Sequence, residues 1–187
     1  MIMRVGILGG TFNPPHIGHL VLAETAKEKL NLDKVIFVPT NRPPHKKTYL
    51  VEGKIRFEMV KLAVEGCPYF EVLDWEIKRG GISYTIDTLR ALRKRYPKRD
   101  FFLLIGSDLA NNFTAWRGYR EIRELTTVVA VKRKNLPLRK KGFVTIDIVN
   151  IEITSSLLRS YIKKGISVKY LIPQKVLNYI RRHKLYL

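Results

Sequence analysis

The chain has 187 residues, 45% of them apolar, which is enough to bury the core of one compact domain but not comfortably two. Its 35 lysines and arginines against 16 acidic residues leave a formal net charge of +19, which favours polyanionic partners, either nucleic acid or phosphorylated small molecules. The single cysteine, Cys67, excludes an internal disulfide and a cysteine metal cluster.

The sequence contains no apolar run long enough to span a membrane and no signal-peptide pattern, so we expect a cytoplasmic protein. The basic residues are spread along the chain in short, separated runs. This spread favours an enzyme that binds phosphorylated substrates over a nucleic-acid-binding protein. A lysine-rich surface of a heat-adapted protein is a third interpretation. We predict one domain over residues 1–187, with a helical C-terminal part over roughly 153–187.

The first predicted element is a buried strand at residues 5–8, which a glycine-rich loop connects to a helix. The paired glycines Gly9 and Gly10 let the backbone approach a ligand closely, and the first turn of the helix presents N–H groups to an anion. His16 and His19 project to the same side of that turn, and Gly18 leaves room for a nucleotide. We predict a phosphate site here. The alternative is that His16 caps the helix and His19 is an ordinary half-buried imidazole.

A second strand is predicted at 34–39, and a proline-rich loop follows it at 40–51. Loops at the carboxyl ends of parallel strands bind ligands in open α/β sheets. We therefore expect this loop to lie over the same site, with Lys46 and Lys47 as candidates to reach a phosphate. The alternative is an exposed basic loop.

The next elements are a helix at 52–65, with Cys67 as a core residue at its end, and a strand at 70–73. The alternating pattern of 74–77 predicts that this strand continues. A glycine pair then breaks the strand and precedes a helix that ends near residue 96. Ser83 or Thr85 could cap that helix, but a cap explains neither the two glycines nor Tyr84.

Residues 101–105 form the most apolar predicted strand, which we expect at the centre of the sheet. Gly106 and Asp108 follow it, and Asp108 can bind a ribose hydroxyl or cap a helix. Trp116 lies in a polar segment and offers a flat face for stacking a ring. A further strand at 128–131 brings Arg133 to the ligand edge.

The C-terminal part begins after a last strand at 143–148. Residues 153–159 open a helix with hydroxyl groups in its first turn, including Ser155 and Ser156, and Arg159 one turn on. These groups and the free N–H groups predict a second anion site, although a well-capped helix would look the same. A final helix is predicted at 174–182.

The run His16-Ile17-Gly18-His19 resembles the T/H-x-G-H signature of the nucleotidylyltransferase superfamily. Further stretches, in order along nearly the whole chain, resemble bacterial nicotinate-nucleotide adenylyltransferases. The chain has Asn13 where many members have Asp. Asparagine keeps a turn-forming side chain but loses the charge. The resemblance implies an α/β fold, a Rossmann-like doubly wound parallel sheet with helices on both faces. It implies transfer of AMP from ATP to nicotinate mononucleotide (NaMN), giving deamido-NAD and pyrophosphate.

The resemblance also implies roles for matching residues. The implied catalytic residues are His16, His19 and Lys46. The implied ATP-binding residues are Gly9, Gly10, Thr11, Phe12, His16, Gly18, His19, Gly106, Asp108, Arg133, Ser155, Ser156 and Arg159. The nicotinate nucleotide would be bound by Tyr84, Thr85, Trp116 and Lys46. Mg²⁺ would be held mainly by the ATP phosphates, because the motif loops contain few carboxylates.

Three alternatives for function stay open. A phosphopantetheine adenylyltransferase would share the nucleotide half, the amidated nucleotide NMN could replace NaMN, and a basic RNA-binding module could keep the scaffold without activity. A homo-oligomer is also possible. We expect the two imidazoles to face one cavity together with Trp116 and Arg159.

Overall fold

The computed structural model describes residues 2–44, 50–132, 137–149 and 151–187. Within these residues an open sheet of six parallel strands has the order β3-β2-β1-β4-β5-β6. The strands are β1 (Arg4–Gly10), β2 (Lys34–Pro39), β3 (Phe70–Val72), β4 (Asp100–Gly106), β5 (Thr127–Lys132) and β6 (Val144–Asp147).

The four inner strands are apolar on both faces, as strands covered on both sides must be. In β4, Phe101, Leu103 and Ile105 point to one face, whereas Phe102 and Leu104 point to the other. The same alternation in β1, β2 and β5 produces two separate cores, one on each side of the sheet. The central place predicted for β4 is confirmed, since it lies between β1 and β5.

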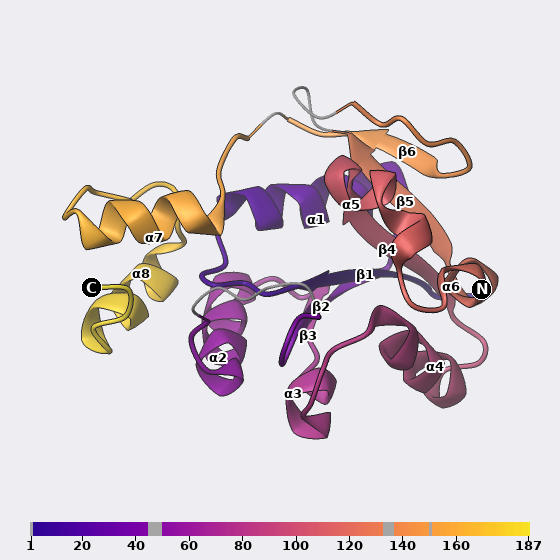
Figure 1. The fold of residues 1–187 in the computed structure, drawn as a ribbon, viewed down its shortest axis with the longest axis horizontal. Helices are drawn as coiled ribbons and strands as arrows, with labels where there is room; N and C mark the ends of the chain where they lie inside the picture. The colour runs from indigo at the N-terminus through magenta and orange to yellow at the C-terminus, as the bar shows by residue number, and fades with distance from the viewer. Residues whose placement is uncertain (1, 45–49, 133–136, 150) are drawn as a thin grey trace.

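Helices cover both faces, and Figure 1 shows α1 on one side of the strands and α4 on the other. Apolar residues of α1 (Ile17–Lys29) and α2 (Gly53–Val64) pack into one core. The other core receives α4 (Thr85–Arg95), α5 (Ser107–Asn111), a short 3-10 helix at Phe113–Ala115, and α6 (Tyr119–Leu125). The prediction of a doubly wound α/β sheet is confirmed. None of the described helices is long and apolar enough to cross a bilayer.

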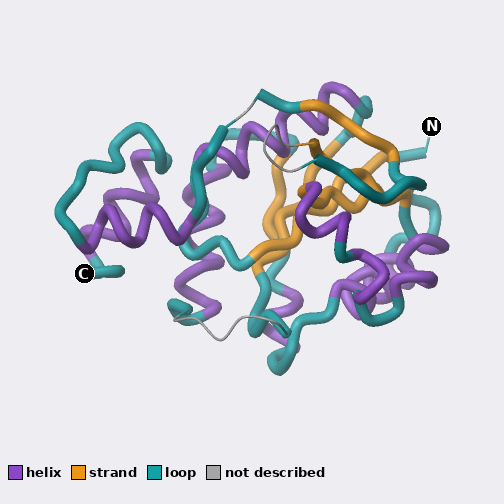
Figure 2. The backbone as a smooth tube through the Cα atoms, turned by 45° about the horizontal axis from the view of Figure 1, so that its top comes forward, coloured by secondary structure: helices purple, strands orange, loops and turns teal. Residues whose placement is uncertain are grey.

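The last two helices, α7 (Ser155–Lys163) and α8 (Gln174–Arg182), lie together at one end of the molecule, away from β6 (Figures 1 and 2). A third apolar cluster joins Leu158 of α7 and Val176 of α8 to Met59 of α2. The backbone N–H of Ile17 donates to the carbonyl of Leu171 at 3.1 Å. The C-terminal part is therefore attached to the start of α1.

Two local predictions are wrong. Residues 74–77 do not continue β3, because the chain forms the short helix α3 (Trp75–Arg79), which is stabilised by an ion pair between Asp74 and Lys78. Gly80, with φ of 73°, ends this helix. Cys67 is not a core residue; it lies three residues beyond the end of α2 and is half-buried.

Candidate active site

The sheet reverses its winding between β1 and β4, which pair in parallel with Ile7 opposite Leu103. Ligands of open α/β sheets bind outside the carboxyl ends of the strands at such a switch point. A cavity of about 400 Å³ lies along this edge. Its walls include residues that follow β1 and β2, the start of α4, and the segment after the 3-10 helix, among them Gly9, Gly10, Thr11, Thr40, Tyr84, Thr85 and Trp116.

The buried side chain of Phe12 supports the loop after β1. Its backbone has φ of 46°, and its ring is 1% exposed, 5.9 Å from the ring of Phe37 and 4.9 Å from that of His19. The ring also closes the space beside Gly10, where an added Cβ would lie 3.0 Å from it. Phe12 therefore supports the loop through its side chain, and only its backbone can contact a nucleotide.

The two imidazoles stack on one another, with ring centroids 3.8 Å apart. His16 is 6% exposed, whereas His19 is half-buried. The backbone N–H of His16 donates to Nδ1 of His19 at 3.2 Å, so the neutral His19 ring carries its proton on Nε2. A Cβ at Gly18 would lie 3.1 Å from Nδ1 of His16, so only glycine fits here without displacing that ring.

The start of α7 docks on the same loop. Oγ of Ser155 donates to the carbonyl of Pro14 at 2.9 Å, and Arg159 donates to the carbonyl of Asn13 at 2.9 Å. Arg159 also donates to Oγ of Ser156 at 3.3 Å. Thr154 caps the helix by accepting from the N–H of Leu157. The hydroxyl and guanidinium groups predicted as an anion site thus lie beside the histidine loop.

Asn13 links this loop to the C-terminus. Its side-chain oxygen accepts hydrogen bonds from the Tyr186 hydroxyl at 2.9 Å and from the N–H of Val51 at 3.3 Å. Asn13 is 1% exposed, and its amide oxygen accepts both hydrogen bonds without the cost of burying a charge that an aspartate would have.

Arg56 is a residue of the site that sequence reasoning missed. It is 1% exposed, and its guanidinium donates to the carbonyls of Val51 at 2.7 Å, Thr11 at 2.8 Å and Asn41 at 2.8 Å. Burial lowers the pKa of Arg56. It joins the histidine loop to the residues on either side of the undescribed segment 45–49. The sequence did contain a signal for its burial, because Arg56 lies one helical turn before the apolar Met59 and so on the same face of α2.

Glu76 was missed because the alternation of 74–77 predicts a strand. It is 4% exposed, it contributes to the cavity wall, and its Oε1 accepts a hydrogen bond from the Thr88 hydroxyl at 2.5 Å. Burial raises the pKa of Glu76, against the effect of the Thr88 hydrogen bond. Burial therefore works against the charged form of this carboxyl group.

The start of α4 forms the far end of the cavity. Tyr84 is the residue before the first turn, and no side chain caps that turn. The alternative that Ser83 caps this helix is wrong, because Tyr84 is at the N-cap position and Oγ of Ser83 accepts from the N–H of Asn41 at 2.9 Å. Trp116 is half-buried, packs on Phe113 at 5.5 Å and lines the cavity, as a stacking platform would.

The structure groups the predicted residues in three places. Six line the cavity: Gly9, Gly10, Thr11, Tyr84, Thr85 and Trp116. A second group lies where α1 meets α7: His16, Gly18, His19, Ser155, Ser156 and Arg159. Gly106 ends β4, and the exposed Asp108 lies in the first turn of α5. Lys46, Lys47 and Arg133 lie outside the described residues.

The expectation of one shared cavity is therefore wrong in part. His16, His19 and Arg159 do not line the cavity that contains Trp116. The reason is local: His16 packs on His19, while Arg159 is engaged by the carbonyl of Asn13. The described residues contain no group of three or more acidic, histidine or cysteine side chains that could hold a metal ion.

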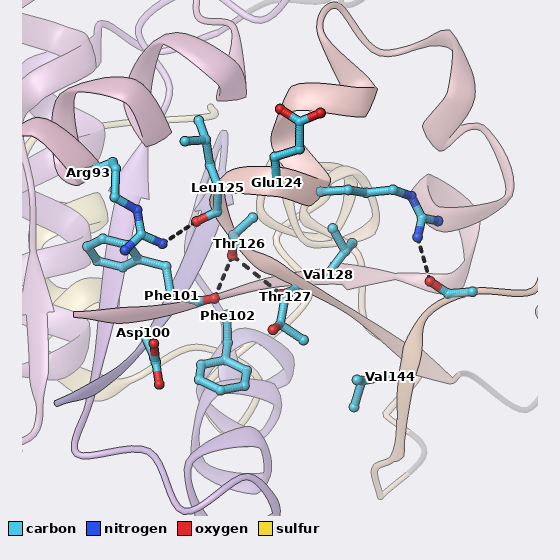
Figure 3. Close-up of a pocket in the computed structure, with 12 residues that line it drawn as sticks. Arg93, Asp100, Phe101, Phe102, Glu124, Leu125, Thr126, Thr127, Val128 and Val144 are labelled. Carbon is cyan, nitrogen blue, oxygen red and sulfur yellow. Dashed lines mark hydrogen bonds between the residues drawn. The ribbon is translucent and has the colours of Figure 1, made fainter. Parts of the chain in front are cut away.

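A second cavity, of about 430 Å³, lies at the amino ends of β4 and β5 (Figure 3). Arg93 on its wall donates to the carbonyl of Leu125 at 2.5 Å, and the Thr126 hydroxyl donates to that of Phe101 at 2.7 Å. The hydrogen-bond donors of these side chains are engaged by backbone carbonyls of the protein. The cavity also lies at the edge of the sheet opposite the switch point. We therefore place the candidate active site at the carboxyl ends.

The family model described as cytidylyltransferase-like matches residues 7–174. With the parallel sheet and the histidine loop at its switch point, this match places the chain among the nucleotidyltransferases.

Similar proteins narrow the class. A protein of Shouchella clausii, named probable nicotinate-nucleotide adenylyltransferase, is 42% identical over 185 residues, covering 98% of this chain and 96% of the relative. A protein of the same name from Oceanobacillus iheyensis is 39% identical, with 98% and 96% covered. The chain belongs to the nicotinate-nucleotide adenylyltransferase family.

Among solved structures, the nicotinic acid mononucleotide adenylyltransferase of Plasmodium falciparum, complexed with NaAD, superimposes with a TM-score of 0.84. The alignment covers 98% of this chain and 97% of the other at 18% identity. At this identity the likeness shows a common fold.

Proposed function

We propose that the protein transfers AMP from ATP to NaMN and releases pyrophosphate and deamido-NAD. The carrying observation is the cavity at the switch point, which begins at the glycines beside the histidine loop and ends at Trp116 and the first turn of α4. The groups that suit a triphosphate lie beside the glycine end of the cavity, and the other end suits an aromatic ring with an anionic substituent. The names of the full-length relatives support this assignment.

The groups that would bind the ATP phosphates are hydrogen-bond donors. Nε2 of His19 carries the proton of the neutral ring, so it can donate to a phosphate oxygen. The first N–H groups of α1 and α7 add partial positive charge, and Arg159 of α7 reaches the loop that precedes α1. For ATP to use Arg159 or Ser155, their hydrogen bonds to the loop carbonyls must be shared or exchanged. The resemblance assigns Lys46 and Arg133, which lie outside the described residues, to the ATP phosphates as well.

The reaction needs no general base, because the 5′-phosphate of NaMN is already an anionic nucleophile. One of its oxygens forms a bond to the α-phosphorus of ATP, while the bond from that phosphorus to the bridging oxygen of the β-phosphate breaks. Pyrophosphate leaves with the electron pair. Catalysis then consists of in-line positioning and neutralisation of charge on the transferred group. His19 would contribute most when that charge is greatest, in the transition state.

The chain's own site supplies histidine, hydroxyl and arginine groups around the loop. Mg²⁺ prefers oxygen ligands, keeps several waters and commonly binds through substrate phosphates. We therefore propose that Mg²⁺ is held mainly by the triphosphate, where it would neutralise charge on the β- and γ-phosphates.

The acceptor substrate would bind at the other end. Trp116 offers its face to the pyridine ring, and the uncapped N–H groups and Thr85 hydroxyl at the start of α4 can donate to a carboxylate.

The test is pyrophosphate release from ATP and Mg²⁺ with NaMN, NMN or phosphopantetheine in parallel assays. We expect release to be fastest with NaMN and negligible with phosphopantetheine. Release with phosphopantetheine alone, or with none of the three, would refute the proposal. RNA binding that weakens steeply with salt, without any pyrophosphate release, would favour the RNA-binding alternative.

A further inference from the structure

Arg117 places a cation at the acceptor end of the cavity. It follows Trp116 directly, is exposed, and lines the same cavity. Its guanidinium carbon lies 4.7 Å from the ring centroid of Tyr84. A guanidinium stacked on an aromatic ring keeps the N–H groups at its edge directed away from that ring, where they can meet a planar anion.

No carboxylate of the protein neutralises this cation. Every aspartate and glutamate belongs to the described residues, and none of their ion pairs includes Arg117. Two other arginines are neutralised in this way, since Arg79 pairs with Asp87 of α4 at 3.6 Å and Arg90 of α4 pairs with Glu121 at 2.5 Å. Arg117 therefore has its charge available for a ligand.

The other charged groups at this end do not cancel that charge. Tyr84, on which Arg117 stacks, directly precedes the first turn of α4, whose N–H groups carry partial positive charge. Glu76 is the carboxyl group of the cavity wall, and it is 4% exposed. Its Oε1 is engaged by the Thr88 hydroxyl at 2.5 Å, and burial raises its pKa.

We propose that Arg117 determines specificity for the acceptor substrate by binding the carboxylate of the nicotinate ring. A guanidinium has only donors, so it can pair with both oxygens of a carboxylate but not with the NH₂ of an amide. The charged acceptor NaMN is thereby favoured over NMN. This inference rests on the proposed function, which does not itself require Arg117.

The experiment measures kcat/KM for NaMN and for NMN with the wild type and with Arg117→Gln. We expect the ratio of the two values to fall roughly tenfold in the variant, as the loss of a partly solvent-screened charge-assisted contact would cause. Turnover with NMN and the KM for ATP are expected to stay close to the wild-type values. Arg117→Lys keeps the charge without the planar guanidinium, so its ratio is expected to lie between those of the wild type and Arg117→Gln.

Arg120→Gln is the matched control. Arg120 is also exposed and also lies over a tyrosine, 5.7 Å from the ring of Tyr119, but it does not line the cavity. Its removal is expected to leave the ratio unchanged.

An unchanged ratio in Arg117→Gln would overturn the inference. So would an equal loss for both acceptors, because that result would assign Arg117 a packing role on Tyr84. Absence of pyrophosphate release by the wild type with either acceptor would instead refute the proposed function. The two failures are therefore distinguishable.

Discussion

Replacing Arg56 with methionine keeps most of the apolar stem and removes the guanidinium that joins three backbone segments. The variant leaves the carbonyls of Thr11, Asn41 and Val51 without this donor. Each buried acceptor that loses its partner costs about 1–3 kcal/mol, whereas the variant no longer has to desolvate a charge, which offsets part of that cost. We expect a net loss of about 3–5 kcal/mol, as when one member of a buried charged network is removed.

The measurement is urea-induced unfolding of wild type, Arg56→Met and Arg56→Lys. Lysine keeps a charge but cannot reach three separated carbonyls with one ammonium group. The free energy of unfolding of Arg56→Lys is therefore expected to lie between those of the wild type and Arg56→Met. Because Thr11 lies on the cavity wall, the KM for ATP is expected to rise in both variants under conditions where they remain folded. A free energy of unfolding within about 1 kcal/mol of the wild type for Arg56→Met would refute this account of the network.

Three further predictions concern the site. His19→Ala is expected to lower kcat by about two orders of magnitude, as loss of a transition-state donor does, and near-normal turnover would remove His19 from the mechanism. Trp116→Ala is expected to raise the KM for NaMN about tenfold while that for ATP changes little, and the reverse pattern in steady-state kinetics would contradict the stacking role. Glu76 has a raised pKa in the folded protein, so its contribution to stability is present below its ordinary value of 4.5 and is lost as the pH rises through the raised value. In Glu76→Gln this loss is expected to disappear from a series of urea midpoints against pH, and identical pH profiles for both proteins would show that Glu76 is not the group responsible.

Much of the fold was determined by local sequence. Strands with apolar residues at every position must be covered on both faces, so the apolar run at 101–105 was by itself enough to predict a strand at the centre of a parallel sheet. The helix predicted at 174–182 has the bounds of α8, because Pro173 favours a start and the inward residues repeat at helical spacing. The short segment 74–77 has no such length, and alternation over four residues could not distinguish a strand from one helical turn.

For the site, the sequence alone determined where the histidine loop begins, and it predicted Trp116 as a site residue, which the structure places on the cavity wall. Both follow from motifs in consecutive residues. Only the tertiary structure decided that Arg56 binds the carbonyls of Thr11 and Asn41, that Tyr186 donates to Asn13, and that Arg117 lies over the ring of Tyr84. The physical reason is that these contacts join residues far apart in the chain. Periodicity reports the face on which a side chain lies, but its partner depends on how the helices and loops pack around the sheet.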